Sequence, residues 1–389
     1  MSPVASGLAV LAGADYQPLV GRRLGLLTHA AAVAADLRPS ADLLAAAGLD
    51  LRLLFGPEHG LAGQVQDMQP VAAGPGAAVP VISLYGDTAD SLAPSTEQLA
   101  GIDCLLVDLQ DVGCRTYTYA STMRACMAAC GRAGVAVVVL DRPNPIGGRL
   151  REGPLLDGDC RSFVGAFQVP QRHGLTLGEL ARLAQREGVE VELEVIGLRG
   201  WRRGQWFDET GLPWVLPSPN MPALDTATVY PGSVLVEATA LSEGRGITRP
   251  FEILGAPWID GRRLAADLER FDLPGLRVRP LTFRPAFHKH AGRDCGGIQL
   301  HVVDRQRFRP VLTGAAVLQA ARTQAPDDFA WRSQPYEFEP DRPAIDLISG
   351  SPELRRCLDA GGDVRDLLPG WQRRLQRFNE RLDDLLLYP

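Results

Sequence analysis

The segment Gly-Pro-Glu-His-Gly at residues 56–60 places a carboxyl group next to an imidazole, between two glycines and a proline. The apolar residues 51–55 come directly before it and predict a buried strand. Glutamate and histidine both transfer protons in catalysis, and Glu58 has only the titratable His59 beside it, which favours a general acid. A polar turn in which Glu58 caps a helix is the structural alternative. We interpret the segment as a catalytic loop, with Glu58 as a catalytic residue and His59 as a substrate-binding residue.

Polar residues also follow two later runs that predict strands, at residues 103–110 and 135–141. Ligands of a parallel sheet bind beyond the carboxyl ends of its strands, so these residues should meet Glu58 at one edge. Aspartates at strand ends can instead bind loop N–H groups, and an asparagine between two prolines also suits a rigid turn. The candidates are Asp108 and Asp141 for catalysis, and Asp111, Arg115, Tyr117, Arg142 and Asn144 for substrate binding.

Two loops in the second half of the chain add further candidates. Asn220 lies in the segment SPNMP, and Glu243 and Arg245 flank a glycine in the segment LSEGRGITRPFE. A glutamate near two arginines is expected to stay ionised with a lowered pKa, because cations favour the charged form. That favours a structural or substrate-binding role over a proton donor, and we assign Asn220, Glu243 and Arg245 to substrate binding.

Short runs of valine and leucine alternate with helical patterns through the first half of the chain. Apolar runs without polar alternation are typical of parallel strands that are covered on both faces. We predict an α/β fold, with a Rossmann-like parallel sheet domain at residues 1–244 that carries the catalytic loops. A smaller C-terminal α+β domain at residues 245–389 is expected to close the cleft. Residues 214–232 are expected to be irregular, and a strand is expected within residues 232–246.

Composition narrows the class of protein. The net charge of −6 and the pI near 5.6 argue against a dominant surface for nucleic acid or anionic membrane. The seven cysteines include no CxxC pair, and the histidines have no zinc spacing, so we predict no metal or cofactor. Cysteines without framework spacing favour a reducing compartment, and neither a signal peptide nor a membrane span is predicted. We therefore expect a cytoplasmic protein, and the sequence gives no indication of its oligomeric state.

Several long segments resemble one family in order along the chain, from about residue 22 to the C-terminus. They are FGPEHGLAG, VDLQDVGCRTYTYASTM, VLDRPNPIGG, RHGLTLGELA, PSPNMPALDTATVYPG and LSEGRGITRPFEILGAPWI. The chain resembles the NamZ-type exo-β-N-acetylmuramidases, which were long carried as a domain of unknown function. The resemblance implies a Rossmann-like domain, a smaller C-terminal domain and a site in the cleft between them. It also implies release of non-reducing-end N-acetylmuramic acid (MurNAc) from peptidoglycan oligosaccharides or muropeptides, with Glu58 as the catalytic residue.

One segment departs from the family pattern. Family members read close to GLLTNxTG after the first strand, whereas this chain has GLLTHAAAV, with His29 and Ala31 at the departing positions. If that loop contacts the sugar, substrate preference would differ. The absence of a predicted signal peptide also departs from secreted members and points to recycling of cell-wall fragments inside the cell.

The resemblance leaves the mechanism open. Glu58 is expected to protonate the glycosidic oxygen, and Asp108, Asp111 or Asp141 to act as nucleophile or base. Retention, inversion and attack by the N-acetyl group of the substrate are all compatible with the residues. The lactyl carboxylate of MurNAc needs a cation, and a guanidinium suits it best, so Arg115, Arg142 and Arg245 are the candidates.

Two other classes of protein stay open. A non-catalytic muropeptide-binding or sugar-binding protein would use the same cleft without an acid at the right distance. A phosphosugar or nucleotide enzyme is disfavoured, because no GxGxxG or GxxxxGK[ST] motif follows any predicted strand.

Overall fold

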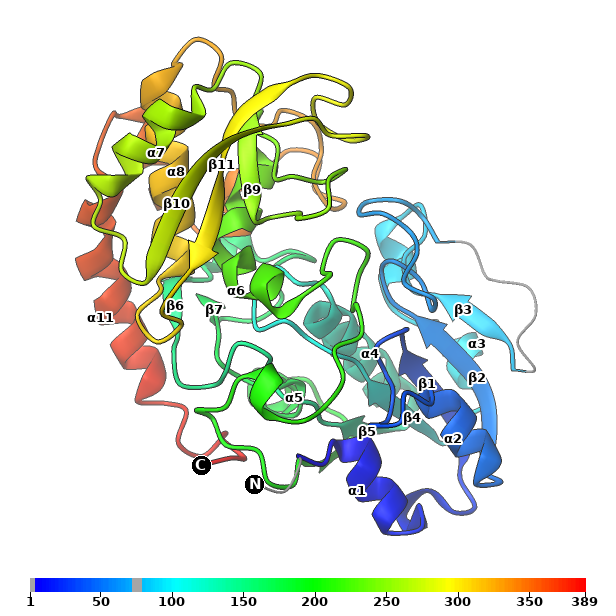
Figure 1. Cartoon of the computed structure of the whole chain (residues 1–389). Helices are drawn as coiled ribbons and strands as arrows, with labels where there is room; N and C mark the ends of the chain where they lie inside the picture. Colours follow the sequence, from blue (N-terminus) through cyan, green and yellow to red (C-terminus); the bar gives the residue numbers. More distant parts are fainter. Residues whose placement is uncertain (1–3, 72–78) are drawn as a thin grey trace.

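The computed structural model describes residues 4–71 and 79–389 and consists of an N-terminal α/β part and a C-terminal part beside it (Figure 1). The N-terminal part is built on a six-stranded parallel sheet with the strand order β3-β2-β1-β4-β5-β8. Its strands are β1 Arg23–Thr28, β2 Asp50–Gly56, β3 Val81–Ser83, β4 Cys104–Asp108, β5 Ala136–Leu140 and β8 Leu193–Ile196. The predicted Rossmann-like sheet is confirmed.

Alternate residues of the central strands enter two separate apolar cores. Leu105 and Val107 of β4 pack with α4 and α5 on one face of the sheet. Cys104 and Leu106 pack with α1 and α2 on the other face. Burial on both faces explains why these strands carry no polar alternation. The helices of this part are α1 Gly7–Gly13, α2 Ser40–Ala46, α3 Thr96–Leu99, α4 Tyr119–Ala133 and α5 Leu177–Arg186.

The C-terminal part contains a three-stranded antiparallel sheet in the order β10-β11-β9, with helices packed beside it (Figure 1). A two-stranded sheet, β6-β7, lies between β5 and α5 in the chain. The strands are β6 Glu152–Leu155, β7 Pro170–Arg172, β9 Ile253–Ala256, β10 Leu276–Phe283 and β11 Cys295–Val302. The helices are α6 Leu224–Ser233, α7 Gly261–Glu269, α8 Pro310–Gln324, α9 Ala344–Ser349, α10 Glu353–Asp359 and α11 Leu368–Asn379. The predicted combination of helices and strands in this part is confirmed.

Two predictions for the middle of the chain are wrong. Residues 214–232 were expected to be irregular, but they contain most of α6, and the strand expected within residues 232–246 is the 3-10 helix Val234–Ala238. Every residue from 226 to 238 is buried, so this segment has no polar stripe that would reveal a helical period.

The helices of the described part of the chain are all too short or too polar to cross a membrane. The predicted cellular location stays a prediction.

A close backbone crossing joins α6 to α8. A Cβ atom on Gly232 would lie 1.8 Å from the carbonyl oxygen of Pro310, and one on Gly314 would lie 2.2 Å from the carbonyl oxygen of Gly232. Both contacts involve backbone atoms, which cannot move aside as a flexible side chain can. The two glycines therefore set the distance between these helices.

We expect Gly232→Ala to lower the free energy of unfolding by about 1–3 kcal/mol, because overpacked cores lose that much. Urea denaturation followed by circular dichroism measures the change. Gly101→Ala is the matched control, since a Cβ there meets no atom within 4 Å. Equal stability of the two variants would contradict the close crossing.

Candidate active site

A small cleft lies between the loops that follow the parallel sheet and the C-terminal part. Its volume is about 40 Å³, which is room for about one water molecule. Acidic side chains line it from both sides: Glu58 and Asp67 from the N-terminal part, and Glu237 and Glu337 from beyond residue 230. A cleft this acidic and this narrow is a candidate for carboxyl chemistry.

The loop after β2 brings Glu58 into the cleft. His59 adopts a left-handed conformation, with φ of 68°, and its Nδ1 lies 2.8 Å from the carbonyl oxygen of Val65. Thr118 Oγ1 donates a hydrogen bond of 2.6 Å to Glu58 Oε2, and the backbone N–H of Met68 donates one of 3.4 Å to Oε1. Thr118 also begins α4, a helix of 15 residues, whose N-terminus attracts negative charge. Both oxygens of Glu58 therefore accept hydrogen bonds.

A row of aromatic rings connects the two sides of the cleft. Tyr119, Tyr117, Tyr230 and Phe251 follow one another edge to face, with ring centroids 4.8, 6.0 and 4.8 Å apart. The hydroxyl of Tyr117 is buried, lines the cleft and has no hydrogen-bond partner among the described residues. A buried hydroxyl without a partner is costly unless a ligand satisfies it, and a sugar hydroxyl can do so.

Arg245 is the cation of the cleft. Its guanidinium lies 3.1 Å from Asp67, 2.7 Å from Glu237 and 3.3 Å from Glu243. Burial opposes the charge of Glu243, but Lys289, Arg245 and His288 together lower its pKa to about 2. The pKa of Glu243 is lowered as predicted, but Lys289 and His288 act with Arg245 in place of Arg249, which pairs with Glu252. Burial instead raises the pKa of Glu237, against the opposing effect of Arg245.

Glu337 reaches the cleft from a loop that precedes α9. The hydroxyl of Tyr85 donates a hydrogen bond of 2.8 Å to Glu337 Oε2. Burial raises the pKa of Glu337 well above its usual range, and the charge of Glu58 raises it further, whereas the hydrogen bond from Tyr85 lowers it. Sequence reasoning missed Asp67, Glu237 and Glu337. The isolated motif YEFE at residues 336–339, which alternates aromatic and acidic residues outside any predicted element, was the only signal for Glu337.

Five of the predicted site residues line the cleft: Glu58, His59, Tyr117, Asn220 and Arg245. Asn220 is held there by a hydrogen bond of 2.7 Å from its Nδ2 to Gln66 Oε1. Glu243 stands behind Arg245 and does not line the cleft.

The structure does not bring the two predicted catalytic aspartates to the cleft. Asp108 forms a bidentate ion pair with Arg142, at 2.6 and 3.0 Å, and Arg142 also donates to the carbonyl oxygen of Val33. Asp141 accepts hydrogen bonds from Thr176 and Tyr388, and from two backbone N–H groups. Both side chains are fully buried and tie the strand ends to neighbouring loops. Their contacts support the structural alternative for strand-end aspartates.

Three predicted binding residues, Asp111, Arg115 and Asn144, also serve the fold rather than the cleft. Asp111 accepts a hydrogen bond from the N–H of Gly113. Arg115 donates to three backbone carbonyl groups and is not oriented by Asp111. Asn144 stabilises its own turn by accepting from the N–H of Ile146 and donating to the carbonyl oxygen of Leu175. The polar loops of this sheet edge hold one another in place, and Glu58 and Tyr117 line the cleft.

His29, in the segment that departs from the family pattern, is buried under the edge of the sheet. Its Nε2 accepts a hydrogen bond of 2.9 Å from the N–H of Gln110, so its Nδ1 carries the proton and faces the carbonyl oxygen of Pro217 at 3.3 Å. Burial lowers the pKa of His29 to about 3. His29 does not line the cleft that holds Glu58, and it acts as a neutral link between three loops.

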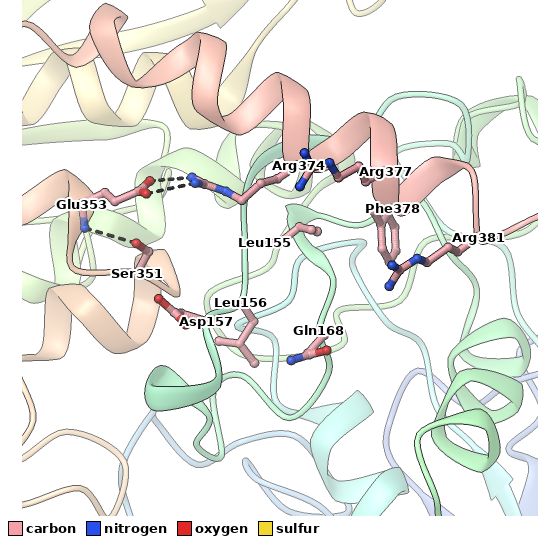
Figure 2. Close-up of a pocket in the computed structure, with 10 residues that line it drawn as sticks. All are labelled: Leu155, Leu156, Asp157, Gln168, Ser351, Glu353, Arg374, Arg377, Phe378 and Arg381. Atoms are coloured by element: carbon pink, nitrogen blue, oxygen red, sulfur yellow. Dashed lines mark hydrogen bonds and ion pairs between the residues drawn. The ribbon is translucent and has the colours of Figure 1, made fainter.

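A second groove lies between α11 and the segment after β6, with a volume of about 340 Å³ (Figure 2). Arg374 and Arg377 project from α11 along it, Arg381 does so from the turn after α11, and Arg374 pairs with Glu353. None of the predicted site residues lines this groove. The residues that the structure describes contain no group of three or more ligands that could hold a metal ion.

A cleft that places buried carboxyl groups beside hydroxyl and amide side chains is the kind of site that glycosidases use. Two family profiles, exo-beta-N-acetylmuramidase NamZ N-terminal and C-terminal, match residues 24–225 and 228–388. The chain therefore belongs to the NamZ exo-β-N-acetylmuramidase family. The profiles meet between residues 225 and 228, and the predicted domain boundary at 244/245 stays a prediction.

The relatives agree with this assignment. The chain is 40% identical over 379 residues to the peptidoglycan beta-N-acetylmuramidase NamZ of Bacillus subtilis strain 168, covering 96% of this chain and 89% of that protein. A crystal structure of a DUF1343 family protein from Bacteroides fragilis NCTC 9343 is 32% identical, with a TM-score of 0.90 over the full length of both chains. A second such structure from the same organism is 26% identical, with a TM-score of 0.78, and covers 100% of this chain and 99% of the other.

We expect Asp108→Asn to lower the free energy of unfolding by about 3–5 kcal/mol, because it leaves Arg142 buried without its anionic partner. Turnover per folded molecule is expected to be unchanged at a temperature where the variant is folded. Urea denaturation and a glycosidase assay measure the two quantities. Asp36→Asn, in an exposed ion pair with Arg38, is the control, with a change under about 1 kcal/mol. Normal stability together with lost turnover would return Asp108 to the catalytic residues.

Proposed function

We propose that the protein hydrolyses the β-glycosidic bond of MurNAc at the non-reducing end of peptidoglycan fragments. The family membership supports the reaction and the substrate class. The observation that carries the proposal for this chain is the position of Glu58. Its carboxyl group is buried against Thr118, the residue before α4, in an acidic cleft between the two parts of the chain.

The charges of the cleft suit this reaction. Glycoside hydrolysis passes through a transition state in which positive charge develops on the sugar ring. Acidic side chains on both walls of the cleft lie where they would stabilise that charge. The hydroxyl of Tyr117 and the amide of Asn220 are available to bind sugar hydroxyl groups. We propose that Glu58 is one of two catalytic carboxyl groups.

Arg245 is the best candidate to bind the lactyl carboxylate. It is the one member of the three arginine candidates that lines the cleft, whereas Arg115 and Arg142 are occupied in the fold. Asp67 is the partner of Arg245 that the substrate would replace, because its side chain is 14% exposed and the side chains of Glu237 and Glu243 are more deeply buried. A substrate carboxylate at this position would keep the guanidinium paired.

A non-catalytic sugar-binding protein is the alternative function. Such a protein would bind MurNAc glycosides in the same cleft without releasing the aglycone. Turnover of a para-nitrophenyl β-MurNAc glycoside separates the two functions, with the corresponding GlcNAc glycoside measured alongside.

We expect Glu58→Gln to lower kcat on the MurNAc glycoside by several orders of magnitude while binding persists, because the amide can neither take nor give the proton. Steady-state kinetics and calorimetric titration with a MurNAc ligand measure the two effects. Glu152→Gln is the matched control, since Glu152 is largely buried but lies outside the cleft. Near-normal turnover by Glu58→Gln would reject the assignment.

We expect Arg245→Lys to reduce the preference for MurNAc over GlcNAc glycosides by about 10-fold or more, since a lysine keeps the charge but loses the bidentate geometry. The ratio of kcat/KM for the two glycosides measures this preference. Arg203→Lys, in a buried pair with Glu179 outside the cleft, controls for general loss of stability. An unchanged ratio would exclude Arg245 as the lactyl-binding residue.

A further inference from the structure

An unusual turn carries Glu337 into the cleft. Tyr336 and Glu339 exchange both backbone hydrogen bonds, at 3.2 and 2.9 Å, so Glu337 and Phe338 are the two central residues of a tight turn. Their φ angles are 49° and 65°, in the left-handed region. Turns of this kind normally use Asn-Gly or Asp-Gly, because other side chains are strained there. The contacts of the neighbouring side chains must therefore hold this turn in place.

Those contacts reach across to the N-terminal part of the chain. Phe338 packs edge to face against Tyr85, with ring centroids 5.4 Å apart, and also against Phe163 at 6.3 Å. The Tyr85 hydroxyl binds Glu337 directly. On the other side, Tyr336 donates a hydrogen bond of 2.7 Å to Glu237. Contacts on both sides therefore hold the strained turn in place, with the carboxyl group of Glu337 at its tip.

Glu337 and Glu58 face the same small cleft but are bound differently. Glu58 accepts hydrogen bonds on both oxygens, one of them from the N–H of Met68, which can only donate. Glu337 accepts only from the Tyr85 hydroxyl, and no described residue donates to its Oε1. Both carboxyl groups line the same small cleft, and burial together with the charge of Glu58 raises the pKa of Glu337. The contacts and burial therefore favour Glu337 as the proton donor of the pair.

We propose that Glu337 is a catalytic residue, the general acid that protonates the glycosidic oxygen, while Glu58 acts as the base. The proposal rests on the proposed function and gives to Glu337 the proton transfer that the sequence led us to expect of Glu58. The proton of Glu337 passes to the glycosidic oxygen as the bond to C1 breaks, and the aglycone leaves as an alcohol. A water oxygen bonds to C1, and its released proton goes to Glu58. Exchange with solvent then returns both carboxyl groups to their starting states.

The leaving group provides the test. A general acid is needed for a sugar aglycone and much less for 2,4-dinitrophenolate, which departs without a proton. For Glu337→Gln we expect kcat/KM on MurNAc–GlcNAc to fall by about 10²–10⁴-fold. On 2,4-dinitrophenyl β-MurNAc the same variant should lose less than about tenfold. Glu58→Gln should lose activity on both substrates, and Glu339→Gln, in the same turn but paired with Arg342 outside the cleft, on neither.

The possible outcomes separate the two proposals. Equal losses of Glu337→Gln on both substrates, or no loss on MurNAc–GlcNAc, would overturn the role of Glu337 and leave the proposed function intact. Absence of turnover by the wild-type protein on both substrates would overturn the proposed function, and the role of Glu337 with it.

The pH profile gives a second readout through Tyr85, a positioning residue for Glu337. Activity should decline as pH rises through the pKa of Glu337, because the proton donor is then lost. Tyr85→Phe removes a hydrogen bond that favours the carboxylate, so the basic limb of kcat/KM should move to higher pH. An unmoved limb, or one shifted to lower pH, would overturn the proposal. The other titratable or charged groups that line the cleft are Glu58, His59, Asp67, Tyr117, Tyr230, Glu237, Arg245 and Tyr336.

Discussion

The cleft depends on one buried cation. Arg245 lies within ion-pairing distance of Asp67, Glu237 and Glu243, and a buried carboxylate without such a partner costs several kcal/mol. Asp67 comes from the loop after β2, and the two glutamates come from the segment before β9. The guanidinium therefore joins the two walls of the cleft at the same time as it neutralises them. The proposed reaction uses the two other carboxyl groups of the cleft, those of Glu58 and Glu337.

The cleft is also narrow in this structure. A volume of about 40 Å³ holds a water molecule but not a pyranose ring, since small-molecule sites usually occupy about 300–1,000 Å³. The turn at residues 336–339 forms part of this narrow cleft, and its contacts with Tyr85 and Phe163 span the two walls. Its left-handed residues are strained, so these contacts fix the position of the Glu337 carboxyl group.

The sequence predicted the sheet and the loop of Glu58 because both depend on local pattern: an unbroken apolar run, then glycine, proline and polar residues. It did not distinguish functional from structural aspartates at the same edge. Asp108 and Asp141 have the residue type and position of catalytic groups, and only their partners, Arg142 and Tyr388, reveal that their lone pairs are occupied. Glu337 could not be placed at all. Its position depends on an irregular loop, distant in the sequence, that packs against the cleft. The spacing of residues in the sequence does not indicate such a contact.

The hydrogen bond between Tyr388 and Asp141 has a consequence for the order of folding. It joins residues that are 247 positions apart, and Asp141 directly follows β5. The N–H of Leu387 donates to Glu179 in α5, and the carbonyl oxygen of Pro389 accepts from the N–H of Arg203. With the hydrogen bond from the N–H of Leu198 to the Tyr388 hydroxyl, residues 387–389 make four hydrogen bonds to the N-terminal part. During synthesis on a ribosome, its strands can form early, but its polar interior stays incomplete until the whole C-terminal part has emerged. The two parts have separate architectures, but they complete their folding together.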